Sequence, residues 1–148
     1  MSRDHYVPQF LLKKFSVSAK NDQVFAYDKW EDTEFPTNVG NICSENDYNY
    51  IEVETIIEKL ETPTKIIIDK ILKEKNLNSL TKEEKDTLKS FSIVQLYRTR
   101  KFRESLKQQM FQELDDEILA KDITSKIIKD HTEIAKFLDN KDWFLYEN

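Results

Sequence analysis

The sequence has very little glycine, proline and cysteine, and each shortage excludes a class of fold or site. Among 148 residues there are one Gly and three Pro, whereas an all-β sandwich needs many turns built on these residues. Because Cys43 is the only cysteine, a disulfide within the chain is excluded and a cysteine-based zinc site is not expected. Together the shortages favour long helices.

Long apolar runs are absent as well. No segment approaches the roughly 20 apolar residues that a membrane-spanning helix needs. The opening residues, MSRDHYVPQF, contain no apolar run of signal-peptide length. The sequence therefore predicts a cytoplasmic protein without a membrane partner.

Neither sign of charge dominates strongly, since the net charge is −5. Contact with DNA or RNA would have to use a local basic patch. Arginine occurs only at Arg3, Arg98, Arg100 and Arg103, and three of these four lie within six residues. Because arginine is preferred where an anion is bound by two parallel hydrogen bonds, the cluster is a candidate anion site.

Aromatic residues are sufficient for a core, with nine Phe, six Tyr and two Trp. A chain of this length fits one domain with one core, so a single domain over residues 1–148 is predicted. The fold class predicted is α+β, mostly α, with a small N-terminal β element packed on three long helices.

The expected elements follow from hydrophobic period and capping signals. They are a helix over 8–15, strands over 23–30 and 34–38, helices over 52–75, 81–119 and 122–138, and a strand over 141–146. Thr81 and Glu84 form a capping box that opens the longest helix. Pro63 either kinks its helix or restarts it after an N-cap at Thr62.

Polar residues interrupt two of the apolar helical stripes. Gln95 and Arg98 share a face with Phe91 and Phe102, and Glu61 falls inside the stripe of the preceding helix. A buried arginine must be paired, which predicts an ion pair between Arg98 and Glu61. Two interpretations stay open: a structural network that fixes helix register, or a polar pocket in which Arg98 binds an anion.

Two histidines and two exposed cations carry further predictions. His131 interrupts the stripe of the last helix and is interpreted as a core histidine with its hydrogen bonds satisfied. Arg100 and Lys101 lie off the Arg98 face, so they are predicted to be exposed to solvent.

His5 and Gln9 flank the start of the first helix, where backbone N–H groups attract anions. The alternative is that this segment only docks the helix through its apolar residues.

Several motifs resemble one known family. They are His5 to Ser16 (HYVPQFLLKKFS), Tyr27 to Lys29 (YDK), Leu60-Glu61, and the set Gln95, Arg98, Thr99 and Arg103. The chain is similar in these to the bacterial and phage domain-of-unknown-function family 4238, in its N-terminal half only. The resemblance implies no known activity, but it implies that these residues recur together. It also implies that the chain is either a natural short form or a fragment, which would bind without catalysing if a second half completes the site.

The resulting candidate site comprises His5, Gln9, Glu61, Gln95, Arg98 and Arg103, and we predict that the first helix brings His5 and Gln9 onto the Gln95–Arg98 face. There is no phosphate-binding loop, dinucleotide turn, zinc spacing or nucleophile elbow in the sequence. No metal site and no cofactor are therefore expected.

Three functions remain open. The first is a binding module for an anionic ligand, a nucleotide or a nucleic-acid end, with a role in phage–host conflict. The second is a metal-dependent nuclease or hydrolase that uses His5 as general base or metal ligand and Glu61 as its carboxylate partner. The third is a protein-interaction or inhibitor domain in which the polar network is purely structural.

Overall fold

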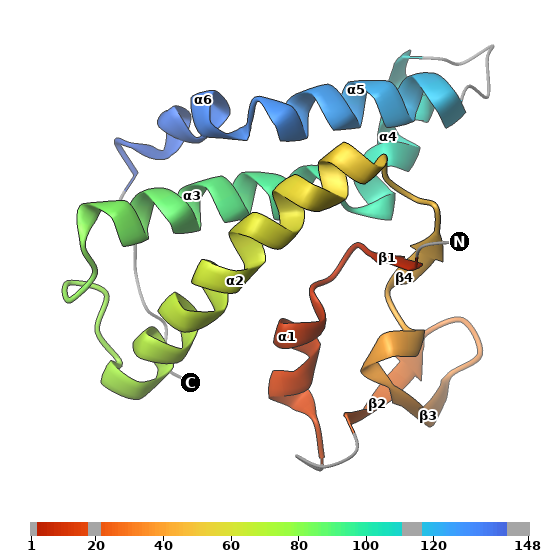
Figure 1. Ribbon diagram of the computed structural model, residues 1–148. Helices are drawn as coiled ribbons and strands as arrows, with labels where there is room; N and C mark the ends of the chain where they lie inside the picture. The colour runs from red at the N-terminus through yellow and green to blue at the C-terminus, as the bar shows by residue number, and fades with distance from the viewer. Residues whose placement is uncertain (1–2, 18–21, 111–116, 142–148) are drawn as a thin grey trace. The chain divides into compact units, whose positions relative to one another are not determined.

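The computed structural model describes residues 3–17, 22–110 and 117–141 (Figure 1). The chain divides into two compact units, Met1–Tyr48 and Asn49–Asn148, which are described separately below. A single domain over residues 1–148 stays a prediction. Within the described ranges, no helix is both long and apolar enough to cross a membrane.

The first unit contains the small antiparallel β elements that the sequence predicts. Strand β1 (Arg3–His5) pairs with β4 (Ser44–Asn46), and β2 (Gln23–Asp28) pairs with β3 (Thr33–Asn38). The predicted first helix is observed as α1 (Gln9–Leu12) followed by a 3-10 turn, η1 (Lys13–Phe15), and a second 3-10 turn is η2 (Val39–Asn41). Pro8, with φ of −57°, occupies the N-cap of α1, which suits its fixed backbone angle.

Strand β2 ends two residues earlier than predicted. The Asp28 carboxylate accepts hydrogen bonds from the backbone N–H groups of Trp30 at 2.9 Å and Glu31 at 3.3 Å, which turns the chain. Asp32 follows with φ of 51°, a left-handed conformation that aspartate tolerates better than most residues. A side-chain turn therefore replaces the glycine turn that is usual in a hairpin.

The second unit is helical. Its elements are α2 (Ile51–Glu74), α3 (Lys82–Tyr97), α4 (Arg100–Met110), α5 (Glu117–Lys129), α6 (His131–Ala135) and the 3-10 turn η3 (Lys136–Leu138). With α1, six α-helices are found in the described part of the chain, and the predicted mostly α fold class is confirmed. The predicted strand over 141–146 lies outside the described residues from residue 142 onward.

Helix α2 owes its packing face to apolar residues spaced three and four apart. They are Val53, Ile57, Leu60, Ile67 and Ile71, with Thr64 at the one polar position of this series. Pro63 lies within the continuous helix. The Thr62 hydroxyl donates to the Glu58 carbonyl at 3.4 Å, as in a helix interior, so the predicted restart with Thr62 as N-cap is not observed.

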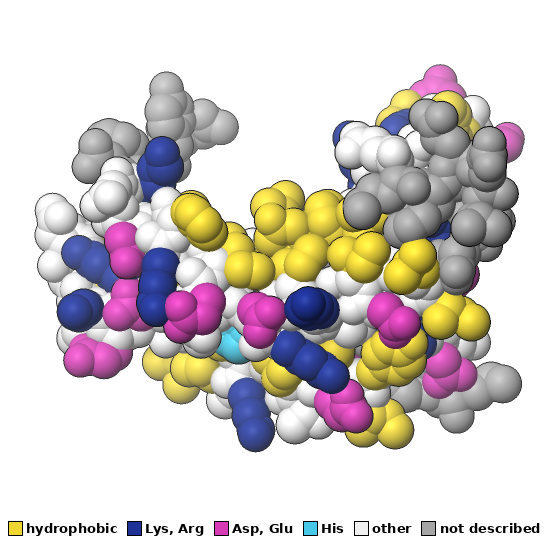
Figure 2. Space-filling model, turned by 90° about the horizontal axis from the view of Figure 1, so that it is seen from above, with side chains coloured by type: hydrophobic (Ala, Val, Ile, Leu, Met, Phe, Trp, Pro, Cys, Tyr) yellow, Lys and Arg dark blue, Asp and Glu magenta, His cyan; other side chains and the backbone are white. Residues whose placement is uncertain are grey.

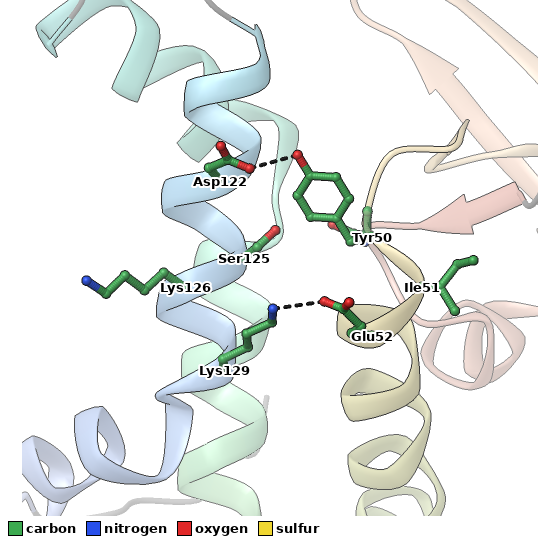
Figure 3. A pocket seen from close by; sticks show the side chains of 8 residues that line it. Tyr50, Ile51, Glu52, Asp122, Ser125, Lys126 and Lys129 are labelled. Carbon is green, nitrogen blue, oxygen red and sulfur yellow. Dashed lines mark hydrogen bonds and ion pairs between the residues drawn. The ribbon is translucent and has the colours of Figure 1, made fainter.

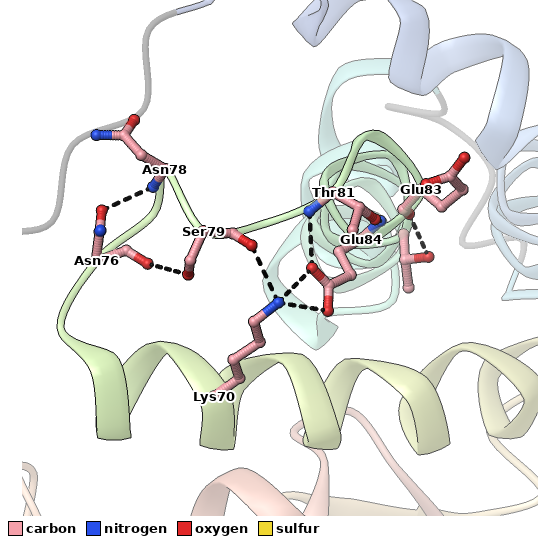
Figure 4. Close-up of polar contacts among 8 residues, drawn as sticks. Lys70, Asn76, Asn78, Ser79, Thr81, Glu83 and Glu84 are labelled. Atoms are coloured by element: carbon pink, nitrogen blue, oxygen red, sulfur yellow. Dashed lines mark hydrogen bonds and ion pairs between the residues drawn. The ribbon is translucent and has the colours of Figure 1, made fainter.

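Helices α2 and α3 run antiparallel and are joined by a short turn that is held by several hydrogen bonds (Figure 1). The predicted capping box is confirmed: the Thr81 hydroxyl accepts from the Glu84 N–H at 3.2 Å, and the Glu84 carboxylate accepts from the Thr81 N–H at 2.8 Å. Lys70 of α2 reaches across to this box, donating to Glu84 at 2.9 Å and to the Ser79 carbonyl at 3.1 Å (Figure 4). At the end of α2, Lys75 adopts a left-handed conformation with φ of 50°.

The helices predicted over 81–119 and 122–138 were wrong in their bounds. Helix α3 ends at Tyr97 instead of continuing to 119, because Thr99 starts a new helix: its hydroxyl accepts from the Phe102 N–H at 3.2 Å and donates to the Leu96 carbonyl at 3.1 Å. The helix predicted over 122–138 is divided after Lys129, since Asp130 leaves helical geometry with ψ of 14°.

The core of the helical unit has an apolar part and a polar part. Two apolar clusters are formed by Val53, Ile57, Val94 and Ile128, and by Ile67, Leu80 and Leu88. Yet the largest wholly buried side chain among the described residues is that of Arg98. Because a buried charge must be compensated, the surroundings of this arginine determine the candidate site.

Candidate functional site

Arg98 is paired with Glu61 as the sequence predicts. Arg98 Nη1 lies 2.8 Å from Glu61 Oε1, and the Arg98 side chain is 0% exposed whereas that of Glu61 is 27% exposed. Burial lowers the pKa of Arg98 from its ordinary value, and the nearby charges of Glu61 and Glu54 oppose this shift. Because a guanidinium stays protonated in proteins, the site holds a buried positive charge between two carboxylates.

Glu54 extends this arrangement toward the start of α2. It lies seven residues before Glu61, so both project from nearly the same side of the helix. The Asn49 side-chain amide donates to Glu54 Oε1. Asn49 and Glu54 occupy the positions that form a hydrophobic staple in many helices, and here a polar contact replaces it.

Arg103 contacts the side-chain oxygen of Asn49, whose amide nitrogen contacts Glu54. Its Nη2 donates to Asn49 Oδ1 at 3.3 Å, its Nη1 lies 3.7 Å from Glu117 Oε1, and it is only 3% exposed. Lys107 also pairs with Glu117. We call the set Asn49, Glu54, Glu61, Arg98, Arg103 and Glu117 the arginine network.

Three members of the arginine network were missed in the sequence. Asn49, Glu54 and Glu117 were not predicted, although the seven-residue spacing of Glu54 and Glu61 was a usable signal. Asn49 and Glu117 gave no such signal in the sequence. Both contact Arg103, which follows a helix boundary that the sequence pattern does not reveal. The predicted members Glu61, Arg98 and Arg103 are all observed in or beside the network.

Gln95 lies in α3, three residues before Arg98, which is the C-cap of that helix. Its Nε2 atom is buried and has no hydrogen-bond acceptor among the described residues, and the same holds for the hydroxyl oxygen of Thr64. Neither atom takes part in the arginine network.

His5 and Gln9 contact each other within the first unit. Gln9 Nε2 lies 3.4 Å from His5 Nε2, across the start of α1. The predicted convergence of these two residues with the Gln95–Arg98 face stays a prediction. His131, the other histidine, is half-buried and its Nδ1 lies 2.8 Å from the Ile128 carbonyl oxygen, so the bond to backbone expected of a core histidine is present.

A cleft of about 700 Å³ opens beside the arginine network, between the start of α2 and helix α5. Its lining residues are Asn49, Tyr50, Ile51, Glu52, Asp122, Ser125, Lys126 and Lys129. Two contacts bridge it: the Tyr50 hydroxyl donates to Asp122 at 2.7 Å, and Lys129 pairs with Glu52 at 2.9 Å (Figure 3). Asn49 therefore belongs both to the wall of the cleft and to the arginine network.

Two positive charges, those of Lys121 and Arg103, act on Tyr50. Lys121 Nζ lies 4.5 Å from the centre of the Tyr50 ring, a cation–π distance. The hydrogen bond to Asp122 raises the pKa of the Tyr50 hydroxyl, and the charge of Arg103 acts in the opposite direction. Lys126 points away from Tyr50 and Glu52 in Figure 3 and makes no ion pair with a described residue.

On the face that Figure 2 shows, basic and acidic side chains are interspersed. Within the described ranges, no three His, Cys, Asp or Glu side chains are grouped so that they could hold a metal ion. Arg100 and Lys101 are exposed, as predicted, and Arg100 pairs with Glu104 at 2.8 Å.

Comparison with known protein families gives a match over nearly the whole chain. The sequence pattern of a family described as protein of unknown function (DUF4238) matches residues 3–148. The match covers essentially the whole chain, which corrects the expectation of a resemblance in the N-terminal half only. No curated protein and no solved structure matches the chain.

Proposed function

The chain belongs to the family described as protein of unknown function (DUF4238). From the geometry of the helical unit, we propose that it is a binding module for an anionic ligand of nucleotide size. One observation supports this most directly. The cleft between α2 and α5 has a volume of about 700 Å³ and is lined by Lys126 and Lys129. This volume falls within the range of small-molecule pockets, roughly 300–1,000 Å³.

The lining residues suit the parts of a nucleotide or a nucleic-acid end. The Tyr50 ring offers an aromatic surface for a base, since base–aromatic stacking is common in nucleic-acid binding. Lys126 has an ammonium group on a flexible stem that can turn toward a phosphate. Lys129 becomes available when a phosphate replaces Glu52 as its partner.

The arginine network serves this proposal by holding the wall of the cleft. Arg103 fixes Asn49 at 3.3 Å, and Arg98 is fully buried against Glu61. The burial of Arg98 supports the structural interpretation of that residue over direct ligand contact. In the proposal, Glu61, Arg98 and Arg103 position the site, and a role in binding for Gln95, His5 and Gln9 stays a prediction from the sequence.

Titration of the protein with inorganic phosphate, ATP and a 5′-phosphorylated single-stranded oligonucleotide tests the proposal. We expect ATP or the oligonucleotide to bind, and the double variant Lys126→Ala/Lys129→Ala to bind about tenfold or more weakly, because a charge-assisted hydrogen bond contributes roughly 1.5–3 kcal/mol. Lys65→Ala is the matched control, since Lys65 is an exposed lysine of α2 outside the cleft.

Three outcomes separate the alternatives. Equal weakening by Lys65→Ala would show nonspecific charge attraction and contradict the cleft as the site. Cleavage of labelled oligonucleotide would favour the nuclease alternative. Absence of binding to all three probes would contradict the proposal and favour the protein-interaction alternative.

A further inference from the structure

The β2–β3 hairpin of the first unit has one face on which large apolar side chains are exposed. Successive strand residues alternate between the two faces of a hairpin, and residues directly opposite each other share a face. The register pairs Phe25 with Pro36 and Tyr27 with Glu34, so these four side chains lie on one face, which we call the aromatic face. Phe25 and Tyr27 are 63% and 59% exposed, and Pro36 and Glu34 are exposed as well.

The other face of the hairpin is the more buried one. Val24 is only 4% exposed, Ala26 is half-buried, and Phe35, opposite Ala26, is 43% exposed. Burial of a large aromatic side chain contributes more to folding than burial of valine or alanine. The stability of the hairpin therefore does not explain why Phe25 and Tyr27 are placed outward, and contiguous exposed apolar surface of this kind is typical of interaction sites.

The charges around the aromatic face are mostly negative. Residues 23–38 include four acidic residues and one lysine, a net charge of −3. Glu34 lies on the face itself, and Asp32 accepts a hydrogen bond from the Tyr27 hydroxyl at 2.6 Å. Glu31 and Glu34 make no ion pair with a residue that the structure describes. These carboxylates repel nucleic acid and attract a basic partner.

The hairpin itself contains an example of the contact that a basic partner would make. Lys29 Nζ lies 4.9 Å from the centre of the Trp30 ring, a cation–π distance, and Trp30 is 84% exposed. An incoming lysine or arginine can make the same contact with Phe25 or Tyr27. Its apolar stem then packs on the ring while its charge is met by Glu34.

We propose that the aromatic face binds a basic segment of a partner protein, through lysine or arginine side chains that pack on Phe25 and Tyr27. The contacts are made by side chains over the face, because Pro36 lacks an N–H and makes β3 a poor template for an added strand. This surface belongs to the first unit alone and does not depend on the proposed function of the cleft.

Fluorescence anisotropy of labelled octa-arginine, titrated with the full chain, tests the proposal. We expect Phe25→Ser/Tyr27→Ser to bind about tenfold or more weakly with no change in net charge, since central aromatic residues contribute much of the binding energy of an interface. Glu31→Gln/Glu34→Gln should weaken binding and reduce its dependence on salt. The matched control is Phe137→Ser, which should leave binding unchanged, because Phe137 is an aromatic residue of the helical unit that is 78% exposed.

Four results would overturn the proposal. They are absence of octa-arginine binding, equal binding of octa-glutamate, binding unaffected by Phe25→Ser/Tyr27→Ser, and equal weakening by Phe137→Ser. The last two would show attraction by charge alone or by any exposed ring. Because Glu31→Gln/Glu34→Gln removes no apolar contact, its effect on binding and on salt dependence keeps the test valid if the aromatic double variant does not fold.

Two further measurements identify a different occupant of the aromatic face. Sedimentation would show a second copy of the chain if the unmodified protein self-associates and Phe25→Ser/Tyr27→Ser does not. NMR contacts between the Phe25 ring and the helical unit would show that the chain covers the face itself. Either result would overturn binding of a basic partner segment, whereas a monomer without such contacts supports it.

Discussion

The two halves of the α2–α3 seam differ in their polar content. The half near the turn, the apolar half, has Ile67, Leu80 and Leu88 in one cluster. The other half, the polar half, combines the second apolar cluster with the ion pair between Glu61 and Arg98. Apolar burial stabilises without regard to direction, whereas an ion pair needs its two partners at matching positions. We therefore expect the apolar contacts of both halves to supply free energy of folding, and the ion pair to select the alignment of the two helices.

The apolar half has its own ion pair, in which the basic partner Lys70 is half-buried whereas Arg98 is fully buried. Lys70 and Glu84 are 29% and 25% exposed, and together with Thr81 they fasten the turn (Figure 4). Water can solvate these groups when the contact opens, so its loss is less damaging. The same type of contact thus has different consequences at the two ends, depending on how deeply it is buried.

The largest expected effect is that of Arg98→Ala. Removing this side chain leaves Glu61 and Glu54 without their buried partner, which should reduce the free energy of unfolding by roughly 3–5 kcal/mol. Urea denaturation followed by circular dichroism measures the change. A loss below about 1 kcal/mol would contradict the energetic importance of the pair, since breaking a buried pair costs several times more.

A matched pair of variants sharpens the comparison between the halves. Arg98→Met combined with Glu61→Leu removes both charges, and buried pairs replaced in this way are often neutral or gain about 1–4 kcal/mol. Leu88→Ala, in the apolar half, should cost about 2–5 kcal/mol because it leaves a cavity. If the charge-free double variant is as unstable as Arg98→Ala, the ion pair contributes to the free energy of unfolding and does not only select the register of the helices.

An intermediate effect is expected from pH at the turn. The hydrogen bond from Lys70, followed by that from the Thr81 N–H, lowers the pKa of Glu84. A carboxylate with a lowered pKa in the folded state stabilises the protein above its unfolded value of about 4.3, and this contribution is lost as pH falls through the folded pKa. Glu84→Gln should therefore melt at a lower temperature than the unmodified protein at pH 7, with the gap closing toward pH 3. A gap independent of pH would refute the linkage.

The smallest effect is expected at the exposed basic residues of α4. Arg100 is 63% exposed and its partner Glu104 is 51% exposed, so the double variant Arg100→Ala/Lys101→Ala should change the free energy of unfolding by no more than about 0.5 kcal/mol. The same urea measurement serves here. A larger loss would show that burial does not explain the importance of Arg98.

The parts of the fold that could be predicted are those set by local pattern. Glu61 and Arg98 both interrupt apolar stripes, and this alone identified their contact. The capping box at Thr81 was readable because both of its residues lie within four positions. These features depend on helix geometry, which the sequence expresses directly.

The remaining features depend on competition or on tertiary structure. Apolar residues keep a helical spacing on both sides of Thr99, and this pattern favours one long helix. The sequence analysis therefore did not identify Thr99 as the residue that begins a new helix, α4. The cleft is formed by residues from Asn49 to Lys129, which share no local signal. The position of His5 and Gln9 relative to Arg98 depends on the arrangement of the two units, which no periodicity encodes.

The scarcity of glycine has a consequence for the backbone of the turns. Lys75, at the end of α2, belongs to a group of residues with positive φ in the described chain. The group comprises Asp22, Asp32, Cys43, Asp47 and Lys75, and none is glycine. The left-handed conformation costs an ordinary L-residue roughly 1–2 kcal/mol, which aspartate partly offsets through local hydrogen bonds. Substitution of these residues by glycine is therefore expected to relieve backbone strain in the turns. The gain should be greatest at Lys75 and Cys43, and it would leave the core and the cleft unaltered.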